Sequence, residues 1–128
     1  MHNDHDTLFR HVFAQPEHAA SLLRTILPPA LANAIDWSSL RLVAGSSVDE
    51  ELKSRQSDLL FEALIGGQPV LLYVVLEHKT WADRWTALQM LRYIVRIFDR
   101  WRLDHPDAKT LPPAVPIVVH HGDRAWNR

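Results

Sequence analysis

The sequence predicts a mixed α/β domain in which a small central sheet is flanked by helices. Two segments with helical spacing of apolar residues bracket three β-like segments, and one more β-like segment follows the second helix. The most apolar segment, residues 70–76, lacks a polar face, which predicts a central strand covered on both sides. The expected order is therefore helix, three strands, helix, strand.

The first helical segment covers residues 6–26. Pro16 divides it, because proline opens a helix readily but does not continue one. Pro28-Pro29 ends the second part, residues 30–35 predict a further short turn of helix, and residues 36–39 predict a turn.

The strands follow. Residues 40–43 alternate like a half-exposed strand, and the polar residues 45–55 predict a solvated loop. Two longer strands are expected over residues 57–65 and 70–79. Gly66-Gly67-Gln68-Pro69 between them is a hairpin signal.

Residues 81–103 predict the longest helix. Its expected buried stripe consists of Trp81, Trp85, Leu88, Leu91, Val95, Phe98 and Arg102, with Ile94 and Trp101 widening it. A proline-containing loop over residues 104–113 leads to a last strand over residues 115–120. Because little follows that could cover this strand, we expect residues 1–128 to be one domain, the N-terminal part of a longer protein.

Composition limits the possible functions. The 128 residues carry a net charge of -1, so any contact with nucleic acid requires a local basic patch. The chain has no cysteine, which excludes disulfides and thiolate chemistry. The N-terminus lacks a signal-peptide pattern and no apolar run is long enough to span a membrane, so we expect a cytoplasmic protein with no membrane contact.

Two acidic residues and a lysine form the main candidate site. If Ile65 pairs with Val70 across the hairpin, Asp58 lies directly opposite Glu77, and Lys79 shares their face. Two opposed carboxylates repel unless a cation lies between them, and oxygen ligands suit Mg²⁺.

The lysine would then orient a water or stabilise charge on a phosphate. The backbone carbonyl of His78 is a further candidate ligand. Spacing alone slightly favours a different interpretation, in which Asp58 merely begins a strand and Glu77 and Lys79 form an exposed ion pair, because a one-residue slip of the hairpin destroys the alignment. The buried character of residues 70–76 favours the site, since charged residues that end a central strand are often functional.

The long helix carries a second constellation. Gln89 and Tyr93 are one turn apart and would support the metal site, or else belong to the polar side of an amphipathic helix. Arg92, Arg96 and Arg100 form a row that would grip DNA phosphates or simply face solvent.

The sequence gives weaker support for other classes of catalytic site. His78, His120 and His121 have imidazoles that bind metals, but no HxxxH or HExxH spacing on a helix predicts a zinc enzyme. The serines lack the G-x-S-x-G elbow of many hydrolases.

The ordered blocks of the chain resemble the Rpn/YhgA-like family of bacterial recombination-promoting nucleases, also described as transposases. The resemblance spans essentially the whole chain. It is carried by Asp6-Thr7-Leu8-Phe9-Arg10 with Phe13, Leu23 with Leu27-Pro28, Asp36-Trp37-Ser38 with Leu40, Ser57-Asp58-Leu59-Leu60-Phe61, Leu76-Glu77-His78-Lys79, Leu91-Arg92-Tyr93, Leu111-Pro112-Pro113 with Pro116, and His121-Gly122 with Trp126.

This resemblance implies the PD-(D/E)XK nuclease superfamily, with a restriction-endonuclease-like αβββαβ core, Mg²⁺ or Mn²⁺ as cofactor and DNA as partner. Carried over by position, Asp58 and Glu77 would be metal ligands and Lys79 would occupy the superfamily's lysine position. Two positions depart from the pattern: Ser57 replaces the proline of the superfamily name, and Lys79 stands where Rpn-like members usually have glutamine.

Two functions remain open at this stage. The first is a metal-dependent DNA endonuclease linked to recombination or mobile elements, which could act as a homo-oligomer. In this function Asp6 is a weaker candidate, for an additional ligand or a helix cap. The second is a catalytically degenerate nuclease fold that binds DNA or a protein partner.

Overall fold

The predicted mixed α/β class is confirmed. The computed structural model describes residue 12 and residues 14–43, 58–77 and 85–120. Within them the elements are α2 (Pro16–Ile26), α3 (Pro29–Ala34), β1 (Ile35–Leu42), β2 (Asp58–Ile65), β3 (Gln68–Glu77), α5 (Thr86–Asp104) and β4 (Ala114–His120).

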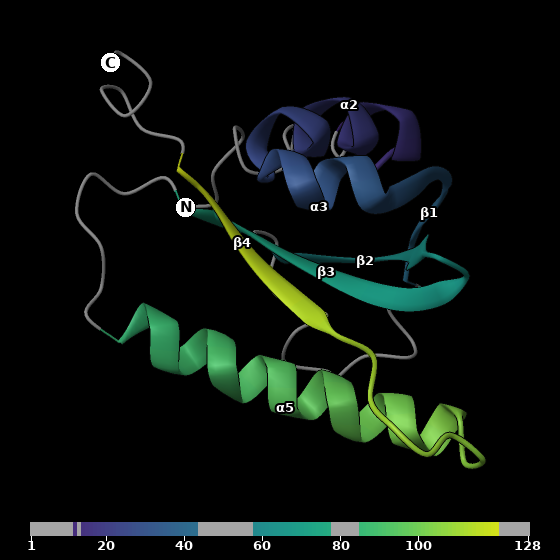
Figure 1. The fold of residues 1–128 in the computed structure, drawn as a ribbon. Coiled ribbons are helices and arrows are strands. Elements are labelled where there is room, and N and C mark those ends of the chain that lie inside the picture. The colour runs from purple at the N-terminus through teal and green to yellow at the C-terminus, as the bar shows by residue number, and fades with distance from the viewer. Residues whose placement is uncertain (1–11, 13, 44–57, 78–84, 121–128) are drawn as a thin grey trace.

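The strands form one sheet with the order β1-β2-β3-β4. The pairs β1–β2 and β2–β3 are antiparallel, whereas β3 and β4 are parallel. A parallel pair needs a crossover connection, and α5 supplies it. Helices α2 and α3 lie on one face of the sheet and α5 lies on the other (Figure 1).

Strand β3 is buried on both faces, as its unbroken apolar sequence predicts. Alternate residues belong to separate clusters, one under α2 and one under α5. The α2 side of β3 carries Val70, Leu72 and Val74, and the α5 side carries Leu71, Tyr73 and Val75. This strand therefore joins the two halves of the core.

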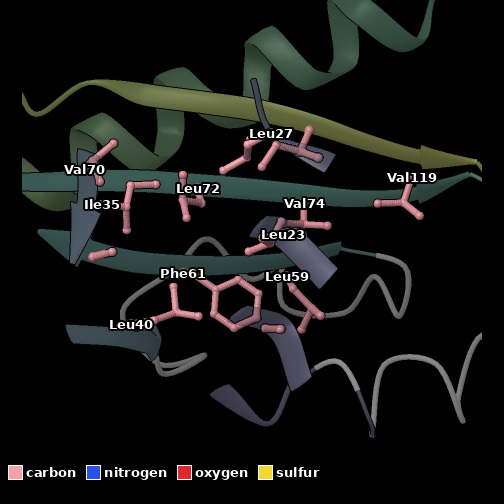
Figure 2. Packing of buried hydrophobic residues seen from close by; sticks show 13 residues of the cluster. Leu23, Leu27, Ile35, Leu40, Leu59, Phe61, Val70, Leu72, Val74 and Val119 are labelled. Carbon is pink, nitrogen blue, oxygen red and sulfur yellow. The ribbon is translucent and has the colours of Figure 1, made fainter. Parts of the chain in front are cut away.

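The cluster under α2 is the larger one. Leu23 of α2 meets Phe61 of β2 and Leu72 of β3, and all three are fully buried (Figure 2). Burying an aliphatic or aromatic side chain of this size contributes about 1.5–3 kcal/mol. This packing holds α2 against the sheet.

A proline begins α2, as predicted, and another proline begins α3, one residue before the start predicted at residue 30. Pro16 and Pro29 each occupy the first turn of a helix, where no backbone N–H is required. The indole Nε1 of Trp37 on β1 donates a hydrogen bond to the carbonyl of Ala32 on α3, at 2.9 Å. Arg24 of α2 lies over the same indole ring, at 6.0 Å from its centroid. Trp37 thus ties β1 to both helices.

The turn predicted over residues 36–39 is wrong, because these residues belong to β1. The pairing of β1 with β2 shifts between Asp36 and Arg41, which indicates a bulge. Side chains satisfy the backbone there: Asp36 accepts a hydrogen bond from the N–H of Ser38, at 3.1 Å. The Ser39 hydroxyl accepts another from the N–H of Leu64, at 2.9 Å. Polar residues that read as a turn therefore form an irregular edge strand.

Helix α5 packs on the sheet through a different stripe from the predicted one. Met90, Tyr93 and Ile97 are buried in the cluster under α5. Four large apolar residues of the predicted stripe are exposed instead, namely Trp85, Leu88, Leu91 and Val95, and so is Leu103. Trp81 of that stripe lies outside the described residues. The predicted residues Phe98 and Trp101 do pack against the buried cluster. Both stripes have helical spacing, and only contact with the sheet distinguishes them.

At 19 residues, α5 is the longest of the described helices. Even so, none of these helices combines the length and apolar character needed to cross a membrane.

Replacing Met90 or Leu91 with alanine tests which stripe of α5 holds the helix. Met90 is 8% exposed and Leu91 is 56% exposed. We expect Met90→Ala to lower the free energy of unfolding by about 2–5 kcal/mol, because it leaves a cavity. Leu91→Ala should change it by no more than about 0.5 kcal/mol. Urea denaturation of both variants measures this, and a larger loss for Leu91→Ala would contradict the observed packing.

Candidate functional site

The β2–β3 hairpin closes through the two residues Gly66 and Gly67. Their φ angles are +58° and +81°, and two positive values in succession are typical of a type I′ turn. Ile65 therefore pairs with Gln68. The predicted pairing of Ile65 with Val70 is wrong, because only two residues lie in the turn.

This register moves the two candidate acidic positions relative to each other. Asp58 pairs with Val75, so the predicted direct opposition of Asp58 and Glu77 is also wrong. The shift is two residues, and a shift by an even number keeps every residue on its own face of the sheet. Asp58 and Glu77 become diagonal neighbours, a relation that separates Cα atoms by about 7–8 Å.

Both acidic positions lie at the same edge of the sheet, since Asp58 begins β2 and Glu77 ends the antiparallel β3. By alternation they continue the rows that contain Leu60 on β2 and Val75 on β3, both of which pack under α5. The structure describes the backbone of these two positions but not their side chains. The other predicted residues of this centre, His78, Lys79 and Asp6, lie outside the described residues.

Tyr93 and Gln89 differ in their surroundings. Tyr93 is 5% exposed, and its ring meets Tyr73 of β3 edge to face, with centroids 6.5 Å apart. Gln89 is exposed, one turn nearer to the beginning of α5. The shared face predicted for this pair thus contains one side chain packed against the sheet and one open to solvent.

The three arginines of the predicted DNA-binding row are all exposed on α5. Arg96 lies over the ring of Tyr93, at 5.7 Å from its centroid. The Nε atom of Arg100 is 3.4 Å from Oδ1 of Asp104. An exposed ion pair such as that of Arg100 contributes little to stability, so Arg100 can exchange Asp104 for another anion at little cost.

A cavity of about 260 Å³ lies toward the far end of α5. An ion pair between Arg41 and Glu62 lines it, together with Trp101, whose buried Nε1 has no hydrogen-bond acceptor among the residues that the structure describes. Glu62 is four residues along β2 from Asp58, or about 13 Å. No sequence pattern brings these residues together, because β1 and α5 are distant in sequence. The cavity is separate from the acidic edge.

Among the side chains that the structure describes, no three or more His, Asp or Glu groups gather closely enough to hold a metal ion. The described interior therefore offers no rival metal site. The edge at Asp58 and Glu77 remains the candidate.

Comparison with known proteins identifies relatives along nearly the whole chain. Residues 3–128 match the family model described as "Putative transposase, YhgA-like". The chain is 31% identical over 121 residues to recombination-promoting nuclease RpnD of Escherichia coli O157:H7, covering 94% of this chain and 46% of that protein. It is 33% identical over 119 residues to recombination-promoting nuclease RpnC of Escherichia coli K12, covering 93% and 39%.

A further relative carries a different name. The chain is 28% identical over 121 residues to the inactive recombination-promoting nuclease-like protein RpnE of Escherichia coli K12, covering 93% of this chain and 39% of that protein. The chain thus spans less than half the length of these three curated relatives. No solved structure matches it.

Substituting Gly66 tests the turn that sets the hairpin register. A Cβ atom at Gly66 would meet no atom within 4 Å, so the cost of a side chain there comes from the backbone alone. We expect Gly66→Ala to lower the free energy of unfolding by about 1–2 kcal/mol and Gly66→Asn to lower it less, since asparagine tolerates positive φ. Thermal unfolding of both variants measures the difference. Equal stability of wild type and Gly66→Ala would contradict the turn.

Proposed function

The chain belongs to the YhgA-like transposase family, and from this membership we propose that it is a divalent-metal-dependent DNA endonuclease acting in recombination or in the movement of genetic elements. The names of its relatives support nuclease chemistry for the family. The proposed centre consists of Asp58 and Glu77 as metal ligands, with Lys79 beside them.

One observation carries the proposal: two acidic positions end adjacent central strands at the same edge and on the same face. Their neighbours in these rows, Leu60 and Val75, are apolar and buried. A carboxylate beside an apolar layer destabilises the fold unless it is paired. A bound cation removes that cost.

The donor set fits a hard divalent cation. Two carboxylates on diagonal positions offer oxygen ligands, and Mg²⁺ or Mn²⁺ commonly takes one or two carboxylates and keeps several waters. The backbone carbonyl of His78 is a further oxygen donor next to Glu77 in the chain. Such a cation supplies Lewis-acid polarisation of the phosphodiester group.

The residues of the chain would position the reactants. Hydrolysis adds water across a phosphorus–oxygen bond and leaves a phosphate monoester and a hydroxyl group. The ammonium group of Lys79 would hold the attacking water or stabilise the added negative charge on the phosphate. Tyr93 fixes α5 against β3, and exposed Gln89 would then be available to orient substrate.

The arginine row on α5 would bind the DNA backbone. Arg92, Arg96 and Arg100 are exposed and one helical turn apart, and the net charge of -1 makes such a local patch necessary. Contacts of this kind position the duplex without reading its sequence.

The alternative function is a degenerate fold that binds DNA or a protein partner without cutting. The similarity to a relative named inactive supports it. Asp58, Glu77 and Lys79 favour the enzyme, because the full set of candidate groups is present in this chain.

A plasmid-nicking assay with Mg²⁺ or Mn²⁺ tests the proposed centre. We expect Asp58→Ala and Glu77→Ala to lower the nicking rate at least about 100-fold, because the electrostatic contribution of a metal ion is several kcal/mol. Asp99→Ala is the matched control, since Asp99 is an exposed acidic residue on α5. It should cut like the wild type.

Equal rates in all four proteins would exclude the assigned centre. If none of them, the wild type included, cuts with either metal, the binding-only alternative is favoured.

DNA-binding measurements at several salt concentrations test the arginine row. DNA binding weakens as salt rises, and each lost phosphate contact makes the negative slope of log K against log salt shallower by about 0.9. We therefore expect Arg92→Ala and Arg96→Ala each to make this slope about one unit less negative and to weaken binding of all sequences similarly. Arg102→Ala, on the same helix but outside the row, should leave the slope unchanged. Unchanged slopes for the first two variants would contradict the proposed contact.

A further inference from the structure

A histidine joins the acidic edge through the register of β4. Glu77 of β3 pairs with His120 of β4 in the parallel ladder. Paired positions on neighbouring strands lie about 4.8 Å apart and on the same face. His120 is therefore the nearest ionisable position to Glu77 on the neighbouring strand, although the two are distant in sequence.

At this edge the residue type changes from apolar to metal-binding on all three strands. Toward the middle of the sheet, the α5-facing rows carry Leu60 on β2, Val75 on β3 and Val118 on β4, which pack in one cluster. The next positions outward in these rows are Asp58, Glu77 and His120. All three rows thus pass from an apolar residue to a metal-binding residue type at the same edge.

We infer that His120 is a third ligand of the cation proposed for Asp58 and Glu77, and that it makes the centre favour a first-row transition cation such as Mn²⁺ over Mg²⁺. This inference rests on the proposed function, since it needs the two carboxylates as ligands.

The chemical reason is the nitrogen donor. Mg²⁺ is a hard cation that is bound through oxygen and gives up its waters reluctantly. Imidazole nitrogen instead suits first-row transition cations, which accept mixed nitrogen and oxygen ligands. An imidazole beside two carboxylates therefore raises the affinity for Mn²⁺ without a matching gain for Mg²⁺.

Pulsed EPR of Mn²⁺ bound to the 128-residue chain tests this inference without any cleavage reaction. A directly coordinated imidazole produces ¹⁴N modulation of the Mn²⁺ signal. We expect this modulation in the wild type and its loss in both His120→Ala and His120→Gln. His18→Ala, at an exposed histidine of α2, is the control and should keep the modulation. His78→Ala shows whether the histidine next to Glu77 in the sequence supplies the nitrogen instead.

Titration of the same proteins with Mn²⁺ gives the Kd of the metal as a second readout. We expect His120→Ala to raise the Kd for Mn²⁺ about tenfold or more, since removal of even an outer-shell partner of a metal site has an effect of this order. The Kd for Mg²⁺, measured by competition, should stay nearly unchanged. His18→Ala, an exposed histidine on α2, should change neither constant, and thermal unfolding confirms that each variant is folded.

The outcomes separate this inference from the proposed function. If His120→Ala keeps the ¹⁴N modulation and the wild-type Kd while Asp58→Asn loses Mn²⁺ binding, the inference is overturned and the carboxylate centre stands. If Asp58→Asn binds Mn²⁺ as tightly as the wild type, the proposed centre itself fails. Loss of the modulation in His78→Ala alone would assign the nitrogen ligand to His78 and overturn the inference.

Discussion

The two-sided burial of β3 is the constraint on which the rest of the structure depends. A strand whose side chains are apolar on both faces is stable only when a layer covers each face. Helices α2 and α3 supply one layer and α5 supplies the other (Figure 1). The parallel crossover through α5 follows from the same need, because it brings the chain to the open face before β4 pairs with β3.

The central position of β3 also explains where the charged residues of the candidate site lie. Strand β3 carries no charged residue before Glu77 at its end, and β2 begins with Asp58. The other charged residue of β2, Glu62, pairs with Arg41. Antiparallel pairing of β2 with β3 and parallel pairing of β3 with β4 bring one beginning and two ends of strands to a single edge. A rigid sheet edge is well suited to hold ligands at fixed separations.

Different sides of helix α5 carry different kinds of residue. One side, with Met90 and Tyr93, packs on the sheet, and another side carries the exposed arginine row. A third side exposes Leu88, Leu91 and Val95, which are apolar and at helical spacing. A helix that is apolar on more than one side can be placed correctly only by knowing what it packs against.

Four features could be predicted from the sequence: the mixed α/β class, the doubly covered β3, the proline that begins α2, and Asp58 and Glu77 as candidates. These features depend on local composition and periodicity, which a single sequence displays. The hairpin register could be known only from the folded structure, because it depends on whether two or four residues form the turn. The same holds for the buried stripe of α5 and for the pairing of His120 with Glu77, since parallel pairing between positions 43 residues apart leaves no local signal.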